Sequence, residues 1–261
     1  MKSAIKGWAN QANRYGEPLA MRALLSLAIA LLRVPFWLVS APGNRRPHEQ
    51  AFFAQIARGC GISISQQGAP SPKAGTLFIM NHISWADIPV MMALLDADFV
   101  AKSEMIDWPV IGWLALRFDP VFVSRNSQRR SHDQVDAIRA RLKAGRSVIL
   151  CAEGTTSDGT TILPFRTSLF AAADAAQIVQ PIIIAYLTPD GDALSPHRQR
   201  EVAWIDDDAL ISGASRFAKE RTLALVVFLL PVESDGNRKT LAGTVRQRML
   251  DAYAAAPNRP R

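Results

Sequence analysis

Residues 78–89 read FIMNHISWADIP, and this stretch decides how the middle of the chain folds. A mostly apolar run, TLFIM at 76–80, has the length and composition of a short buried strand. It stops just before His82, and the helical pattern ADIPVMMALL follows at 86–95. The stretch therefore predicts a strand-to-helix turn that brings His82 to the mouth of a strand and Asp87 into the following helical turn.

The remainder of the chain alternates between strand and helix patterns. We predict strands at 98–102, 120–124, 147–152, 178–186 and 222–232, and one more after a helix that ends at Gly59. We predict helices at 132–145 and 238–253, and a helix broken by a proline at 104–118. This alternation is typical of an α/β fold with a largely parallel, buried sheet flanked by helices. Ligands of such sheets gather beyond the carboxyl ends of the strands, so the loops there are the candidates for a site.

The composition indicates a folded protein with an anionic partner. The chain has 261 residues, of which 49% are hydrophobic and 20% charged, and this balance excludes a disordered chain. The formal net charge of +7 favours nucleic acid, a membrane surface or a phosphorylated substrate as the partner. Two cysteines, Cys60 and Cys151, make no disulfide framework and fit a reducing compartment.

Residues 19–39 predict an N-terminal membrane-associated helix. The stretch LAMRALLSLAIALLRVPFWLV is long enough to span a bilayer, which needs ~20 apolar residues. Arg22 and Arg33 argue against a simple span, because each centrally placed arginine costs roughly 2.5–3.5 kcal/mol on insertion. Together with Ser26 they fall near one helical face. We therefore expect the helix to lie in the interface of an anionic membrane, with its arginines among lipid phosphates.

Three alternatives compete with that interpretation of the N-terminal segment. The segment could also be a tilted transmembrane helix whose arginine side chains reach the membrane surface, or a core helix of the domain. It would also suit a signal peptide cleaved near Val39-x-Ala41. Residues 41–50, APGNRRPHEQ, look like a linker. The sequence thus predicts a membrane-associated segment at 1–40 and an enzymatic or binding domain at 41–261.

His82 and Asp87 have two possible roles. Ser84-x-x-Asp87 matches a helix capping box, with Ser84 as the N-cap residue and Asp87 three residues later. In that case His82 is an incidental loop residue. Alternatively, His82 is a general base, and Asp87 orients its imidazole and stabilises the imidazolium. The spacing alone favours neither role.

Three further features lie at the ends of predicted strands or within one. Arg125 lies just past the strand at 120–124, where its guanidinium would grip a phosphate or form part of a solvated basic loop. Glu153-Gly154-Thr155 follows the strand at 147–152, where a glycine among hydroxyls turns backbone N–H groups toward an anion or simply makes a turn. Pro181 lies early in the strand at 178–186 and on its own marks a sheet edge or the start of a strand.

Taken in order, these four features resemble the four motifs of the glycerolipid acyltransferase family, which includes the 1-acylglycerol-3-phosphate acyltransferases. The first motif, Asn-His-x₄-Asp, is matched by His82 and Asp87, and the second, which ends in Phe-x-x-Arg, by Phe122 and Arg125. The third, centred on Glu-Gly-Thr, is matched at 153–155, and the fourth, a proline in an apolar strand, at Pro181. The resemblance covers residues 76–186 well and the flanks loosely, and it implies that the predicted domain at 41–261 is an acyltransferase domain.

The sequence departs from the family pattern in two motifs. Asp119 stands where the second motif usually begins with glycine. In the third motif, Cys151-Ala152 replaces Phe-Pro before Glu153, and Thr156 replaces an arginine. The segments AKSEMIDWPVIG at 101–112 and EGTTSDG at 153–159 look more like the bacterial lyso-ornithine lipid acyltransferase branch, whose acceptors carry an amino-acid headgroup and no phosphate.

The resemblance implies transfer of an acyl group from a thioester to the free hydroxyl of a lysolipid. The implied main acceptor is 1-acylglycerol-3-phosphate, which would give phosphatidate, and the alternative acceptor is lyso-ornithine lipid. His82 would be the base and Asp87 its orienter, while Arg125, Glu153, Gly154 and Thr155 would bind the acceptor. Acyl-CoA or acyl carrier protein would be the co-substrate, and we expect no metal and no further cofactor. The implied location is the cytoplasmic face of the inner membrane.

Two other classes of function stay open from the residues alone. A membrane- or nucleic-acid-binding protein without activity would explain the net charge, although no motif with interleaved aromatic and basic residues appears, and we expect no nucleic-acid partner. A thioesterase or other lipid hydrolase would need only water in the place of the acceptor hydroxyl.

Overall fold

The computed structural model describes residues 19–102, 120–123, 128–205, 208, 210–234 and 236–255. The predicted broken helix at 104–118 and the predicted acceptor-binding Arg125 lie outside these residues.

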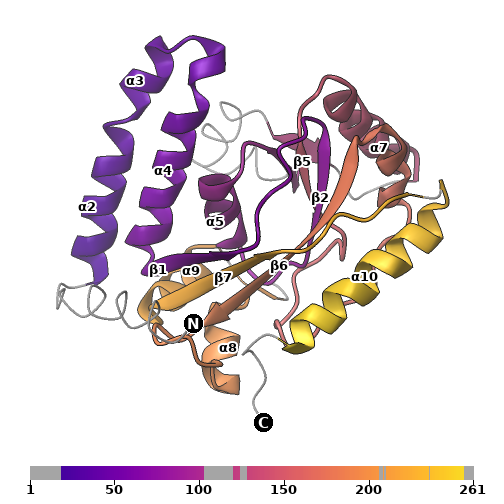
Figure 1. The fold of residues 1–261 in the computed structure, drawn as a ribbon. Helices are drawn as coiled ribbons and strands as arrows, with labels where there is room; N and C mark the ends of the chain where they lie inside the picture. The colour runs from indigo at the N-terminus through magenta and orange to yellow at the C-terminus, as the bar shows by residue number, and fades with distance from the viewer. Residues whose placement is uncertain are drawn as a thin grey trace.

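A seven-stranded sheet forms the centre of the protein (Figure 1). Its strands, in spatial order, are β1 (Ile62–Gln67), β7 (Thr222–Phe228), β6 (Ile178–Leu187), β2 (Thr76–Met80), β5 (Val148–Cys151), β3 (Asp98–Lys102) and β4 (Val121–Val123). Neighbouring strands run parallel except at the β6–β7 pair, which is antiparallel. The predicted α/β fold with a largely parallel sheet is therefore confirmed.

Helices cover both faces of the sheet. One face carries α4 (Arg46–Gly59), α5 (Asp87–Leu94), α8 (Pro196–Val202) and α9 (Leu210–Lys219). The other carries α7 (Gln128–Lys143), the 3-10 helix η3 (Leu169–Ala175) and α10 (Arg238–Ala255). Because successive side chains of a strand point to opposite faces, Phe78 and Met80 of β2 join the first core, and Leu77 and Ile79 join the second. Both faces of β2 are thus buried, which explains its uninterrupted apolar run.

The predicted elements match the structure best where apolar runs are short and buried. The strands at 76–80 and 98–102 have the predicted bounds. Helix α7 begins at Gln128, four residues before the predicted start at 132. Helices α8 and α9 and the 3-10 helix η3 were not predicted, because each is short and lies between polar or small residues. The linker predicted at 41–50 is wrong in its second half, since α4 begins at Arg46 with a proline in its first turn.

The N-terminal apolar segment forms two helices, α2 (Leu19–Leu31) and α3 (Val34–Val39), which lie beside α4 (Figure 1). Arg22 donates through Nε to the Gly59 carbonyl at 3.2 Å and through Nη2 to the Ala218 carbonyl at 2.9 Å. Ser26 is buried and accepts a hydrogen bond from Gln55 Nε2. The prediction that Arg22 lies among lipid phosphates is therefore wrong: the side of α2 that carries Arg22 and Ser26 is bonded to the protein.

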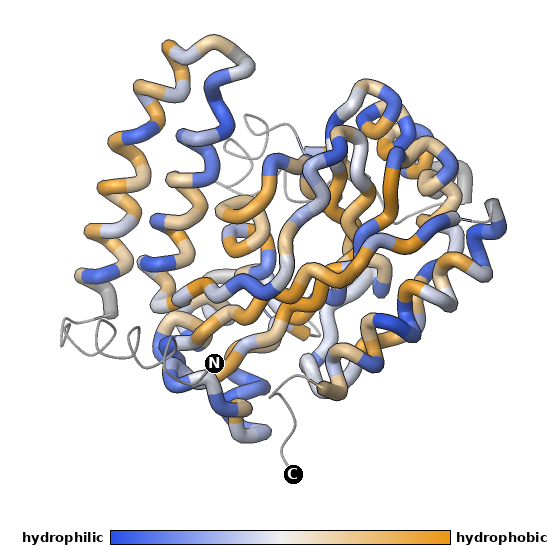
Figure 2. Tube along the Cα trace, in the orientation of Figure 1, coloured by the Kyte–Doolittle hydropathy of each residue, from blue (hydrophilic) through white to orange (hydrophobic). Residues whose placement is uncertain are grey.

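Glycine 59 permits this close helix contact. A Cβ atom at Gly59 would lie 2.5 Å from the Ser26 Cβ, closer than real side chains approach. Because Arg22 and Ser26 of α2 are turned toward the protein, apolar side chains of the helix are left exposed. Figure 2 shows that most of the α2 trace has the colour of hydrophobic residues. Exposed large hydrophobic residues on this side are Met21, Leu24, Leu25, Leu27, Ile29, Leu31, Leu32, Phe36, Leu38 and Val39. Residues Met21–Val39 are also long and apolar enough for a membrane span, by length and composition.

We expect the exposed apolar side of α2 and α3 to hold the protein on membranes. Changing Leu24, Leu32 and Phe36 to serine should move most of the protein from the membrane pellet to the supernatant, because each side chain loses roughly 1.5–3 kcal/mol of burial in lipid. Sedimentation followed by immunoblotting measures the distribution. Leu230→Ser is the control, since Leu230 is 81% exposed but lies after β7. Full sedimentation of the triple variant would assign membrane attachment to another surface.

Candidate active site

Two neighbouring strands at the centre of the sheet bring the site together. In the parallel β2–β5 pair, Met80 stands opposite Cys151. The loops that follow these strands therefore leave the sheet side by side, with His82 and Glu153 each two residues beyond the paired positions. The His82 backbone N–H donates to Glu153 Oε1 at 2.8 Å, so the two loops are also bonded to each other.

The His82 imidazole is bonded to a fully buried carboxylate. Nδ1 of His82 lies 2.7 Å from Oδ2 of Asp87, and the Asp87 side chain has no exposed surface. The same oxygen accepts the backbone N–H groups of Ile83 at 2.8 Å and Ser84 at 3.1 Å. The His82 side chain keeps 17% exposure and lines a pocket. With Nδ1 held by Asp87, Nε2 is the ring nitrogen that can exchange a proton with a substrate, and the Cys151 side chain is the second protein neighbour of the imidazole.

The capping interpretation is wrong for Ser84 and holds in part for Asp87. Helix α5 has Ala86 as its N-cap residue, and the buried Ser84 hydroxyl has no hydrogen-bond partner among the described residues. Asp87 nevertheless satisfies two backbone N–H groups ahead of the helix, which an acidic residue in a first turn commonly does. One carboxylate thus fixes the turn and orients the imidazole, so the two roles considered from the sequence are compatible.

The surroundings of His82 raise its pKa. Burial on its own lowers the pKa, but the neighbouring Cys151 thiol and then the hydrogen bond to Asp87 outweigh that effect. A general base works in its neutral form, which His82 reaches only above the elevated pKa. Activity that depends on this base should therefore rise with pH through a pKa above the ordinary histidine value of ~6.5.

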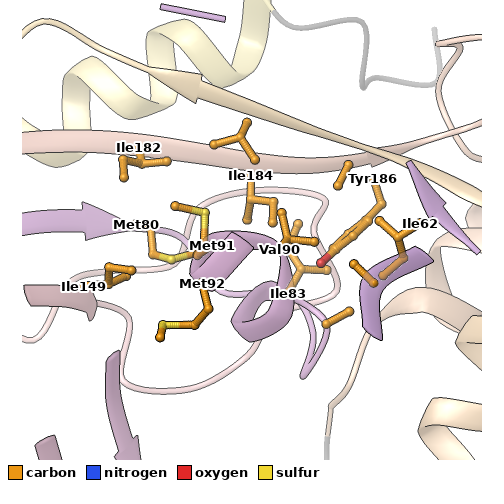
Figure 3. Close-up of a cluster of buried hydrophobic side chains, with 14 of the residues drawn as sticks. Ile62, Met80, Ile83, Val90, Met91, Met92, Ile149, Ile182, Ile184 and Tyr186 are labelled. Carbon is orange, nitrogen blue, oxygen red and sulfur yellow. The ribbon is translucent and has the colours of Figure 1, made fainter. Parts of the chain in front are cut away.

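Tyr186 is a site residue that the sequence did not indicate. Its hydroxyl donates to Oδ1 of Asp87 at 2.7 Å, so each Asp87 oxygen is held. Tyr186 lies on β6, next to β2 in the sheet, and its ring reaches toward Ile83 (Figure 3). Burial and the nearby Asp87 carboxylate raise the tyrosine pKa well above its usual value, so the hydroxyl stays protonated as a donor. The sequence feature that could have indicated this residue is a tyrosine at the end of the apolar strand predicted at 178–186.

Removing the Tyr186 hydroxyl should move the pH dependence of the reaction. In Tyr186→Phe, Asp87 loses a donor that disperses its charge, so it binds imidazolium more strongly and the His82 pKa rises further. The acid limb of the kcat/KM profile should shift to higher pH, and stability should fall by about 1–3 kcal/mol. Tyr253→Phe is the control for the pH dependence alone: its buried hydroxyl donates to the Gly159 carbonyl and not to Asp87, so the acid limb should keep its position even where KM changes. Equal pH profiles for wild type and Tyr186→Phe would mean that the Tyr186 hydroxyl does not influence the His82–Asp87 pair.

Glu153 connects the two loops through both of its oxygens. Oε1 accepts the His82 N–H, and Oε2 accepts the Leu163 N–H at 2.8 Å. The exposed fraction of Glu153 is 3%, and burial raises its pKa to about 7. The two backbone hydrogen bonds act in the opposite direction, because they favour the charged carboxylate. The geometry makes Glu153 a support for the His82 backbone, and its predicted contact with an acceptor headgroup stays a prediction.

Gly154 and Thr155 follow in the same loop. Gly154 has φ of +70°, and a Cβ atom there would lie 2.4 Å from Arg166 Nε, so a side chain is excluded by both conformation and space. Thr155 is exposed and lines the pocket beside His82. This pocket has a volume of about 570 Å³. It is lined by His82, Thr155, Thr156, Ser157, Asp158, Thr160, Thr161, Leu163, Trp204 and Ile205.

The other predicted site positions are only partly placed. Phe122 lies on the edge strand β4, and Arg125 is outside the described residues. Pro181 is buried inside β6 opposite Ile79, so it does not mark a sheet edge. Within the described part of the chain, no group of three His, Cys, Asp or Glu residues is arranged to hold a metal ion.

Comparisons with known proteins agree on one family. A family model described as Acyltransferase matches residues 62–185. The lyso-ornithine lipid O-acyltransferase of Brucella abortus is 35% identical over 243 residues, which cover 88% of this chain and 91% of that protein. The 1-acyl-sn-glycerol-3-phosphate acyltransferase of Neisseria meningitidis is 31% identical over 177 residues, covering 66% and 69%.

A solved structure also matches the fold. It is the crystal structure of the 1-acyl-sn-glycerophosphate acyltransferase from Thermotoga maritima, with a TM-score of 0.64. The match covers 91% of this chain and 94% of that one, at 16% sequence identity. The family match at 62–185 nearly coincides with the residues over which the four motifs were recognised.

Proposed function

This chain belongs to the lysolipid acyltransferase family, and on that premise we propose that it acylates the free hydroxyl of lyso-ornithine lipid. Membership confirms the resemblance drawn from the four motifs, and the enzyme is an acyltransferase. The observation that carries the proposed mechanism is the 2.7 Å contact between His82 Nδ1 and the buried Asp87 carboxylate, at the wall of a pocket. His82 and Asp87 are the proposed base and orienter.

The proposed reaction is a direct transfer with the acceptor hydroxyl as nucleophile. His82 Nε2 removes the hydroxyl proton as the oxygen attacks the thioester carbonyl carbon, and Asp87 stabilises the imidazolium. The tetrahedral intermediate then breaks its carbon–sulfur bond. The departing thiolate takes the proton from the imidazolium, which yields a free thiol, an ester and neutral His82. No enzyme group needs to be acylated on this route.

The pocket chemistry supports an acceptor with an amino-acid headgroup. Among the lining residues that the structure describes, five carry hydroxyl groups and none is lysine or arginine. Thr156, at the position where the family pattern has arginine, donates its hydroxyl to the Trp204 carbonyl and so serves the loop. Among these described residues, a phosphate dianion meets no lysine or arginine that would neutralise it. Lyso-ornithine lipid acyltransferases from Brucella abortus and from Rhizobium meliloti, the latter 32% identical, each align with 88% of the chain.

Lysophosphatidate is the second candidate acceptor. It is supported by the 31% identity to the Neisseria meningitidis enzyme, whose name states that substrate class. The predicted contact between Arg125 and a phosphate also belongs to this alternative. The two acceptors differ in the charge that they bring to the same pocket, so a direct comparison separates them.

The donor and location follow from the same proposal. The donor is an acyl thioester, carried by coenzyme A or acyl carrier protein, and no further cofactor or nucleic acid takes part. The enzyme works at a membrane, on which the exposed apolar side of α2 and α3 rests. Free Cys60 and Cys151 are compatible with the cytoplasmic face of the inner membrane.

One assay tests the proposed function. Purified full-length protein is supplied with an acyl thioester and, separately, lyso-ornithine lipid or lysophosphatidate, and products are identified by mass spectrometry. We expect an acyl ester of lyso-ornithine lipid, formed with a kcat/KM at least tenfold above that for lysophosphatidate. Preference for lysophosphatidate would overturn the proposed acceptor. Free fatty acid as the main product, with either acceptor present, would assign the protein to the hydrolases.

A further inference from the structure

We infer that Asp158 binds the ammonium group of the acceptor headgroup and thereby selects an amino-acid lipid over a phosphate lipid. The inference rests on the proposed function and goes one step further, because it assigns the headgroup selectivity to a side chain. It starts from the juxtaposition of Asp158 and His82 in the wall of one pocket.

One oxygen of the Asp158 carboxylate is fixed and the other is available. Oδ1 accepts the Thr160 N–H at 2.9 Å and the Thr160 hydroxyl at 2.7 Å. In the described part of the chain, no hydrogen bond or ion pair engages Oδ2. Asp158 is exposed and is one of the residues that line the pocket. Because Oδ1 is already held by two hydrogen bonds, the carboxylate loses little conformational freedom when Oδ2 binds a ligand.

The loop is tied to the base that performs the chemistry. Ser157, the residue before Asp158, donates its N–H to the His82 carbonyl at 2.8 Å. On the other side, Gln199 Nε2 donates to the Asp158 carbonyl at 2.9 Å. Gly159 has φ of +74°, and Tyr253 donates its hydroxyl to the Gly159 carbonyl. The carboxylate and the imidazole therefore keep a fixed relation, and a headgroup bound at one orients the hydroxyl at the other.

The charges around the pocket favour a cation at Asp158. Besides His82, Asp158 is the one ionisable side chain among the pocket residues that the structure describes. The others contribute hydroxyls or, as with Leu163, Trp204 and Ile205, apolar surface. A phosphate in this pocket meets a carboxylate with like charge, whereas the side-chain ammonium of an ornithine headgroup meets opposite charge. The same residue thus attracts one acceptor and repels the other.

The test changes the charge on the protein and on the lipid separately. Wild type and Asp158→Asn are assayed with lyso-ornithine lipid and with the same lipid acetylated on its side-chain nitrogen. Asparagine keeps an oxygen for Thr160, so the loop is retained. For wild type, acetylation should raise the acceptor KM by about ten- to hundredfold, the range of a charge-assisted hydrogen bond. Asp158→Asn should raise the KM for the unmodified lipid similarly and leave that for the acetylated lipid nearly unchanged.

Two further measurements complete the test. Asp251→Asn, which alters an exposed carboxylate on α10 outside the pocket, should leave all KM values unchanged. Asp158→Lys should improve the use of lysophosphatidate relative to wild type, because the repulsive charge becomes attractive. If Asp158→Asn raises both lipid KM values equally, or neither, the inference is wrong while the proposed function stands. If wild type acylates no lyso-ornithine lipid, the proposed function fails and the inference falls with it.

Discussion

Replacing His82 by alanine should lower kcat/KM for acyl transfer by at least ~10²–10⁴-fold, the usual contribution of a general base. The loss should fall on kcat, because the imidazole acts on the proton during attack, and the headgroup is bound elsewhere in the pocket. The rate of ester formation, followed by mass spectrometry, measures the effect. His197→Ala is the matched control, since His197 is exposed on α8, outside the pocket, and its removal should leave the rate unchanged.

The Cys151 thiol beside the imidazole offers a competing explanation for the role of His82. Cys151, His82 and Asp87 lie next to one another in that order and so resemble a nucleophilic triad. In such a triad, Cys151 would carry the acyl group. Direct transfer predicts that Cys151→Ala keeps most of the activity and lowers the His82 pKa. Loss of activity in Cys151→Ala, together with an acylated cysteine in the wild-type protein, would contradict direct transfer.

The central sheet could be predicted from the sequence because burial on both faces leaves a strong local signal. LFIM at 77–80 and VILC at 148–151 are continuous apolar runs, and the structure has strands there. Their adjacency could not be derived from such runs, because strand order is decided by packing across the whole domain. The four motifs indicated which loops meet, and the parallel β2–β5 pair shows how His82 and Glu153 meet.

The parts that the sequence did not reveal depend on contacts between distant residues. Arg22 was assigned to lipid phosphates from helical spacing, yet its guanidinium binds carbonyls 37 and 196 residues away. Tyr186 lies 99 residues from Asp87 and reaches it because β6 and β2 are neighbours. Spacing along a helix identifies a face, and tertiary packing decides whether that face meets lipid or protein. For the same reason the role of Glu153 as a backbone acceptor was missed.

Asp87→Asn should produce the second large loss, roughly 10²-fold or more in kcat, with the fold retained. Two backbone donors, the N–H groups of Ile83 and Ser84, point at Oδ2 and will hold the amide oxygen at that position. The amide nitrogen then faces the Tyr186 hydroxyl, which can accept from it. His82 Nδ1 keeps an oxygen partner, so the tautomer is preserved and the variant loses mainly the negative charge.

That loss of charge has a signature beyond the rate. Without the carboxylate, imidazolium is less stable, so the His82 pKa falls and the acid limb of the kcat/KM profile should move to lower pH, opposite to the shift expected for Tyr186→Phe. The double variant decides whether the two residues work as a unit. If Asp87 acts through His82, His82→Ala with Asp87→Asn should cost little more than His82→Ala alone. Multiplicative losses in the double variant would mean that Asp87 acts independently, and the hydrogen bond at 2.7 Å would then be structural.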